Sequence, residues 1–124
     1  MTNLTVRPAV AADAPAMGQL GALLVSAHHE WDAERFMAPR PQAHVGYARF
    51  LESQIEEPDA LVLVAECDQR VVGYVYAAMQ PLDWASLRDA CGYIHDVVVE
   101  PSVRRSGVGR ALLTVGRRAA SSIR

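Results

Sequence analysis

The hydrophobic pattern at the start of the chain predicts a strand followed by a helix. Residues 2–7 alternate between polar and apolar side chains, as in a short strand, and Pro8 either limits the extension of that strand or places it at the edge of a sheet. Apolar residues then recur every three or four positions over 14–28, which indicates a helix. Asp13 stands where the N-cap of this helix is expected, and Pro15 lies in its first turn.

The rest of the chain predicts a second helix, three strands and a final helix. A loop broken by prolines covers 29–41, and helical spacing returns over 43–56. Three apolar runs predict strands joined as a meander: residues 61–66, 71–78 and 92–100. Gly73 indicates a bulge or close packing, and a last helix is expected over 108–121. The order β-α-α-β-β-β-α predicts one α/β domain over residues 1–124, of the α+β arrangement, with a mainly antiparallel sheet and flanking helices.

The composition excludes several classes of function. Hydrophobic residues make up 51% of the chain and charged residues 21%, which is typical of a globular domain. A net charge of −2 provides no positive field for binding nucleic acid, and the absence of lysine excludes a Walker A loop or a Schiff-base lysine. Cys67 and Cys91 form neither a metal-binding spacing nor a disulfide framework. Without a signal peptide or a long apolar run, we expect a cytoplasmic protein that binds no membrane.

The chemistry-bearing motif is a strand, a turn and the start of the final helix, over residues 97–113. Gly107 and Gly109 remove side chains at the helix N-terminus, where backbone N–H groups and a partial positive charge favour an anion. Three arginines add formal charge: Arg104, Arg105 and Arg110. These features predict a site for a phosphate-bearing ligand. A dinucleotide fingerprint is excluded, because Leu112 stands where glycine or alanine is needed.

This segment resembles motif A of the GNAT superfamily of N-acetyltransferases. The family pattern Gln/Arg-x-x-Gly-x-Gly/Ala matches Arg104, Gly107 and Gly109, and the valine-rich lead-in to Pro101 matches as well. The predicted element order also follows the family. The resemblance implies an N-acetyltransferase that moves an acetyl group from acetyl-CoA to a primary amine of a small molecule or peptide by direct attack. The alternative is a non-catalytic acyl-CoA-binding or dimeric interaction module derived from such an enzyme.

The resemblance also implies where acetyl-CoA, the co-substrate, would bind without any metal. The motif A turn would hold its pyrophosphate, and its pantetheine arm would pair with the backbone of the preceding strand. The positions carried over are Val97, Val98, Val99, Arg104, Arg105, Ser106, Gly107, Val108, Gly109 and Arg110. A backbone N–H on this strand would polarise the thioester carbonyl, which is stabilisation by a prealigned dipole.

Two residues are candidates for the base that takes a proton from the amine. His95 occupies a position where some relatives carry a glutamate, and its ordinary pKa of ~6.5 suits a base near neutral pH. Asp96 is the second candidate, and a mere hydrogen bond from His95 to a neighbouring loop remains an open alternative. Strict alternation would place His95 with Val97 and Val99 on one face, and Asp96 with Ile94 on the other.

The amine acceptor is expected near the loop between the first two helices. Glu30, Asp32 and Glu34 form an acidic rim there that would attract a cation, although a solvated polar loop is an equally open interpretation. Trp31 and Trp84 are expected either to line the acceptor pocket or to cover the core.

The family fold normally continues after the motif A helix with a strand, a helix and a hairpin, a region that usually carries a tyrosine acting as general acid. These 124 residues contain no such elements, so we expect a GNAT-like fold truncated after the motif A helix. The valine strand would then lie at an exposed sheet edge, which invites pairing with another chain. We therefore expect a homodimer.

Overall fold

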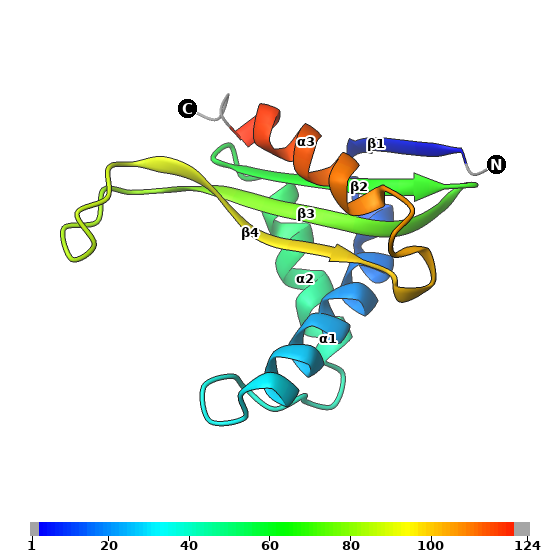
Figure 1. The fold of residues 1–124 in the computed structure, drawn as a ribbon, viewed down its shortest axis with the longest axis horizontal. Coiled ribbons are helices and arrows are strands. Elements are labelled where there is room, and N and C mark those ends of the chain that lie inside the picture. Colours follow the sequence, from blue (N-terminus) through cyan, green and yellow to red (C-terminus); the bar gives the residue numbers. More distant parts are fainter. Residues whose placement is uncertain (1–2, 121–124) are drawn as a thin grey trace.

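The computed structural model describes residues 3–120 and contains the predicted elements in the predicted order (Figure 1). Their bounds are β1 (Leu4–Pro8), η1 (Ala11–Asp13), α1 (Ala14–Trp31), α2 (Ala43–Ile55), β2 (Ala60–Cys67), β3 (Arg70–Gln80), β4 (Cys91–Val99), η2 (Pro101–Val103) and α3 (Val108–Ala120). Ser121, the predicted end of the last helix, lies outside the described residues. Within the described segment, no helix is long and apolar enough to cross a membrane.

The four strands form one antiparallel sheet in the order β1-β2-β3-β4, between two layers of helices. Figure 1 shows α1 and α2 below the sheet and α3 above it. The sheet is buried on both faces because β2 and β3 are apolar at nearly every position. Tyr74 and Val64 face α1 and α2, whereas Val75 and Leu63 face α3. Pro8 lies at the end of edge strand β1, as expected.

Glycines bring α1 and α2 into close contact. A Cβ atom on Gly18 would lie 2.2 Å from the carbonyl oxygen of His44, and one on Gly21 would lie 1.8 Å from the ring of Tyr47. Neither position tolerates a side chain without displacement of its neighbour. This close approach holds Tyr47 between α1 and the sheet, a role that the helical periodicity alone did not indicate.

Two irregularities interrupt the strand pairing. On β3, Val72 is the extra residue, because Gly73 pairs with Ala65 and Val71 with Glu66. A Cβ atom on Gly73 would lie 2.9 Å from the carbonyl oxygen of Val98, so both the bulge and the close packing expected at this glycine are present.

The second irregularity lies on β4 and corrects the predicted faces. Asp96 pairs with Tyr76 and Ile94 with Ala77, which leaves His95 as the extra residue. Because one extra residue reverses the alternation, Ile94 packs in the cluster on the α3 face. His95 stacks on Tyr76, whose side chain belongs to the cluster on the α1 and α2 face, with ring centroids 5.2 Å apart. His95 and Asp96 therefore share one face instead of opposite faces.

Two further expectations change. Trp31 and Trp84 are 72% and 80% exposed, so neither covers the core; Trp84 lies on the long β3–β4 arm that projects from the body in Figure 1. Asp13 precedes α1, but its side chain makes no capping bond there and instead binds Arg7 and the backbone N–H of Val10. The outer edge of β4 pairs with no strand of the described segment, and the homodimer stays a prediction.

Candidate functional site

The turn before α3 has the geometry that an anion site needs. Gly107 adopts a φ of +90°, in the left-handed region that favours glycine, and a Cβ atom there would meet nothing within 4 Å. The first backbone bond at this end of α3 runs from the N–H of Ala111 to the oxygen of Gly107. The N–H groups of Val108, Gly109 and Arg110 thus have no partner inside the helix.

A hollow of about 470 Å³ covers this turn, and two arginines are among the residues that line it. Its lining residues are Arg105, Ser106, Gly107, Gly109 and Arg110. Arg104, Arg105 and Arg110 are all exposed, so their charges face solvent. Val108 contributes its backbone only, because its side chain is buried in the core against α3 and the sheet.

A second hollow, of about 330 Å³, runs between α1 and the end of β4. Its walls are Leu23, Leu24, Ala27, Val97, Val98, Val99, Arg104, Arg105 and Gly109. Arg105 and Gly109 line both hollows, so a single ligand can extend from the turn along β4. Of the ten positions predicted for the co-substrate, all except Val108 line one or both of these adjoining hollows.

Asp96 lies at the centre of a polar cluster that faces α1 and α2. Its Oδ2 accepts hydrogen bonds from the hydroxyls of Tyr47 and of Tyr74, the latter at 3.2 Å. Burial raises the pKa of Asp96, and the nearby charge of His28 lowers it. Burial also raises the pKa of Tyr74, so its hydroxyl remains a donor at neutral pH. Because burial raises its pKa, the carboxylate of Asp96 is suited to accepting a proton.

His95 lies on the same face but in a more open environment. Its ring lies between Tyr76 and Tyr93, and its Nε2 is 2.9 Å from the side-chain nitrogen of Gln80. The hydrogen-bond partner of His95 is therefore Gln80 on β3, not a residue of a neighbouring loop. Partial burial lowers the pKa of His95 below its ordinary value, which keeps the ring neutral near pH 7.

An apolar hollow of about 200 Å³ adjoins this cluster between α1, α2 and the loop that joins them. Its walls are Leu24, Val25, His28, Phe36, Met37 and Tyr47. The predicted acidic rim does not line it: the Asp32 carboxylate instead accepts bonds from the backbone N–H groups of Glu34 and Arg35. Trp31 does not line the hollow either, and its ring lies against Phe36, with ring centroids 5.8 Å apart.

Sequence reasoning missed the tyrosines and the histidine around Asp96. Tyr47 fits the apolar stripe of a helix and Tyr74 an apolar strand, so neither pattern indicates a functional hydroxyl. His28 ends the helix predicted over 14–28, and nothing in the local sequence relates it to Asp96. The contact of Tyr47 with Asp96 joins residues far apart in sequence, and no local spacing could reveal it.

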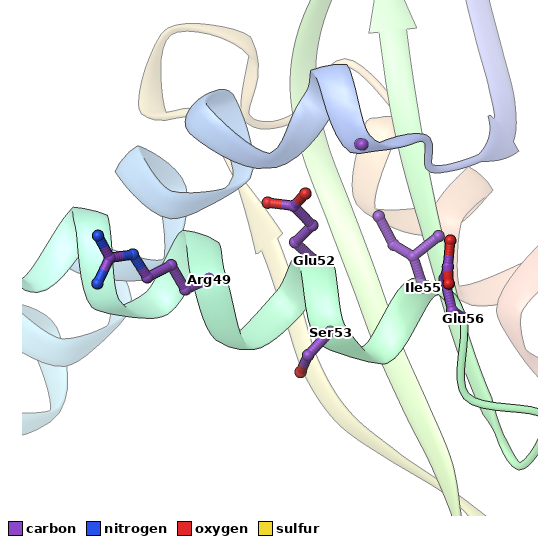
Figure 2. Close-up of a pocket in the computed structure, with 6 residues that line it drawn as sticks. Arg49, Glu52, Ser53, Ile55 and Glu56 are labelled. Atoms are coloured by element: carbon purple, nitrogen blue, oxygen red, sulfur yellow. The ribbon is translucent and has the colours of Figure 1, made fainter.

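A fourth hollow, of about 460 Å³, lies between η1 and α2 and is shown in Figure 2. Glu52 reaches toward α1 there, whereas Ser53 points away from it. Most of its lining residues are exposed: Arg49, Glu52, Ser53 and Glu56. None of its lining residues also lines the hollow along β4 or the apolar hollow beside Tyr47. It has no geometric link to the site described above.

The match to a known family covers most of the chain. Residues 25–122 match the sequence profile of the Acetyltransferase (GNAT) family. The chain belongs to this family. The matched span includes β4, the turn and α3, which carry most of the candidate site of this GNAT chain.

Solved structures share the GNAT fold at low sequence identity. A mutant of a protein from Bacillus halodurans is 18% identical, with a TM-score of 0.75 over 94% of this chain and 74% of that chain. An acetyltransferase from Vibrio fischeri is 20% identical, with a TM-score of 0.67 over 93% and 84%. An aminoglycoside acetyltransferase from a soil metagenome, in complex with sisomicin, is 22% identical, with a TM-score of 0.59 over 94% and 69%. No curated protein matches the sequence significantly.

Proposed function

We propose that this GNAT chain is an N-acetyltransferase that moves an acetyl group from acetyl-CoA to the primary amine of a small molecule or peptide. The observation that carries the proposal is the position of Asp96. Its carboxylate lies on β4, one residue before the valines that line the hollow leading to the motif A turn. A proton acceptor therefore adjoins the path that suits the co-substrate.

The residues along this path fit acetyl-CoA. The free N–H groups at the start of α3, together with Arg104, Arg105 and Arg110, would bind the pyrophosphate. The outer edge of β4, which no described strand covers, offers the backbone of Val97–Val99 to the pantetheine arm. A backbone N–H of this edge would stabilise the charge that develops on the thioester oxygen.

Asp96 would serve as the base. Acetyl-CoA supplies the acetyl group: the amine nitrogen bonds to the carbonyl carbon, the carbon–sulfur bond breaks, and CoA leaves as a thiolate that takes a proton from solvent. The surplus proton of the amine passes to Asp96, whose Oδ1 receives no donor from the described residues, and returns from there to water. Tyr47 and Tyr74 hold Oδ2 and so fix the orientation of the carboxylate.

Calorimetric titration with acetyl-CoA tests the co-substrate path. Gly109 lines both hollows, and a Cβ atom there would lie 3.6 Å from Val99. We expect Gly109→Val to weaken acetyl-CoA binding at least tenfold. Gly46→Val is the matched control, because a Cβ atom there meets nothing within 4 Å and Gly46 lines no part of the path. Equal affinities of the two variants, both shown to be folded by circular dichroism, would refute the assignment.

Release of the CoA thiol in the presence of amines then tests catalysis. The relatives differ in their acceptors, since one is named an aminoglycoside acetyltransferase and another a ribosomal-protein-alanine N-acetyltransferase. The panel therefore includes an aminoglycoside, a peptide with N-terminal alanine, and simple primary amines. Amine-dependent thiol release supports the enzyme. Tight acetyl-CoA binding without release by any amine supports the alternative, a non-catalytic acyl-CoA-binding module.

A further inference from the structure

We propose that the acceptor of this chain is a primary monoamine carrying an apolar group of about six carbons, bound in the hollow formed by Leu24, Val25, His28, Phe36, Met37 and Tyr47. This hollow is called the acceptor hollow below. The inference rests on the proposed acetyltransferase function and names its substrate class.

The walls of the acceptor hollow are apolar although two of its residues carry polar atoms. The Nδ1 of His28 lies 2.8 Å from the carbonyl oxygen of Leu24, so this N–H is already used within α1. The hydroxyl of Tyr47 is bonded to Asp96. Nδ1 of His28 and the hydroxyl of Tyr47 are therefore both engaged, and the surface that lines the hollow is mostly apolar. None of the described residues that line it is an aspartate, glutamate or arginine, so a second ammonium group would find no countercharge inside.

The size of the hollow sets the size of the apolar group. Its volume is about 200 Å³, and an apolar cavity of ~150 Å³ in another protein accommodates benzene. A six-carbon chain or ring therefore fits, whereas an aminoglycoside would not. Met37 is 54% exposed and flexible, so it can adjust to chains or rings of similar volume.

The position of the hollow brings the amine to the reacting centre. Leu24 lines both the acceptor hollow and the hollow that runs along β4. Tyr47 lines the acceptor hollow and bonds to Asp96. A molecule with its apolar group among these residues would therefore have its amine beside Asp96, where the neutral nitrogen meets the thioester carbon.

The far wall of the hollow is held in place. Phe36 packs edge-to-face on His28, with ring centroids 4.7 Å apart. The Nδ1 of His29 lies 3.1 Å from the carbonyl oxygen of Phe36 and ties the loop to α1. These contacts order the loop before any acceptor arrives, which reduces the entropy lost on binding.

A series of amines tests the substrate class. We expect kcat/KM, measured by CoA thiol release at saturating acetyl-CoA, to rise at least tenfold from ethylamine to hexylamine, whose ammonium pKa values are nearly equal. We expect 1,6-diaminohexane to react at least tenfold more slowly than hexylamine, because its second ammonium would have to enter the apolar hollow. A preference for the diamine, or for an aminoglycoside, would overturn the proposal and favour recognition by the acidic loop.

A pair of variants locates the apolar group. Val25→Phe fills the acceptor hollow and should abolish the advantage of hexylamine over ethylamine without changing acetyl-CoA affinity. Val45→Phe makes the same change on α2 at a position that is 36% exposed and outside the hollow, and it should keep the advantage. Loss of the advantage in both variants, or in neither, contradicts the assignment.

Failure of the proposed function gives a separate signature. If acetyl-CoA does not bind by calorimetry, the acetyltransferase itself is refuted. If acetyl-CoA binds but no amine is acetylated, the acetyl-CoA complex is titrated with hexylamine. Tyrosine and tryptophan fluorescence or NMR then shows whether the acceptor hollow binds the amine, independently of catalysis. Saturable binding that is lost in Val25→Phe and kept in Val45→Phe supports the hollow, and the absence of saturable hexylamine binding overturns it.

Discussion

Two tyrosine hydroxyls and a histidine set how readily the Asp96 carboxylate takes a proton. Burial raises its pKa, and the charge of His28 opposes that effect. The hydroxyl bonds of Tyr47 and Tyr74 favour the anion, because a hydroxyl donates to a carboxylate more strongly than to a carboxylic acid. Burial is the largest of these effects, so the pKa of Asp96 lies above its ordinary value.

The pH dependence of kcat/KM separates Asp96 from His95 as the base. We expect Asp96→Asn to lower the rate by 10²–10⁴-fold, roughly the contribution of a positioned base, and to remove the acid limb of the profile. His95→Ala should keep that limb. Tyr74→Phe removes one donor to the anion without touching the acceptor hollow, so it should move the limb to higher pH by about one unit. A limb that persists in Asp96→Asn and disappears in His95→Ala would identify His95 as the base.

At the scale of elements, the sequence predicts what depends on neighbours along the chain. Apolar periodicity and terminating prolines are local signals, and they predict the helices and strands to within a few residues; the glycine and arginine spacing likewise indicates the turn at Gly107. The bulge at His95 was not predicted, because it exists only in relation to the register of β3. The sequence does not predict the polar cluster around Asp96 for the same reason, because Tyr47 contacts Asp96 only when α1 and α2 have packed together.

Gly21 connects the packing of α1 against α2 with the position of Tyr47 in the candidate site. A methyl group on Gly21 would lie 1.8 Å from the ring of Tyr47, so Gly21→Ala should displace that ring from Asp96. We expect a loss of about 1–3 kcal/mol in the free energy of unfolding, together with a reduced rate and an unchanged affinity for acetyl-CoA. Gly46→Ala, on α2 in open space, should raise the stability by up to about 1 kcal/mol. Urea denaturation measures the stability of the two variants, and calorimetry measures their affinity for acetyl-CoA. Full activity in Gly21→Ala would show that catalysis does not depend on the position of Tyr47.

At the scale of the whole molecule, one arginine joins the edge of the sheet to the helical layer. Arg7 on β1 donates two hydrogen bonds to the Asp13 carboxylate, at 2.8 and 3.0 Å, and approaches Glu66 on β2 at 3.5 Å. Asp13 also accepts the backbone N–H of Val10 at 2.8 Å, just before α1 begins. The helical layer that carries the acceptor hollow is thereby attached to the strand farthest from β4.

This attachment should make the fold sensitive to acid. Arg7 holds the pKa of Asp13 below its ordinary value of 3.8, so the contribution of the pair is fully present above about pH 4 and is lost as the pH falls through the folded-state pKa. We expect Asp13→Asn to cost about 1–2 kcal/mol at pH 7, because its charged hydrogen bonds are mostly shielded from water, and to cost much less at pH 2. The control is Glu100→Gln, which removes the exposed ion pair with Arg70 at 2.5 Å and should change stability little at either pH. Urea denaturation of the three proteins at both pH values measures the difference. An equal cost of Asp13→Asn at pH 7 and pH 2 would show that its charge does not stabilise the fold.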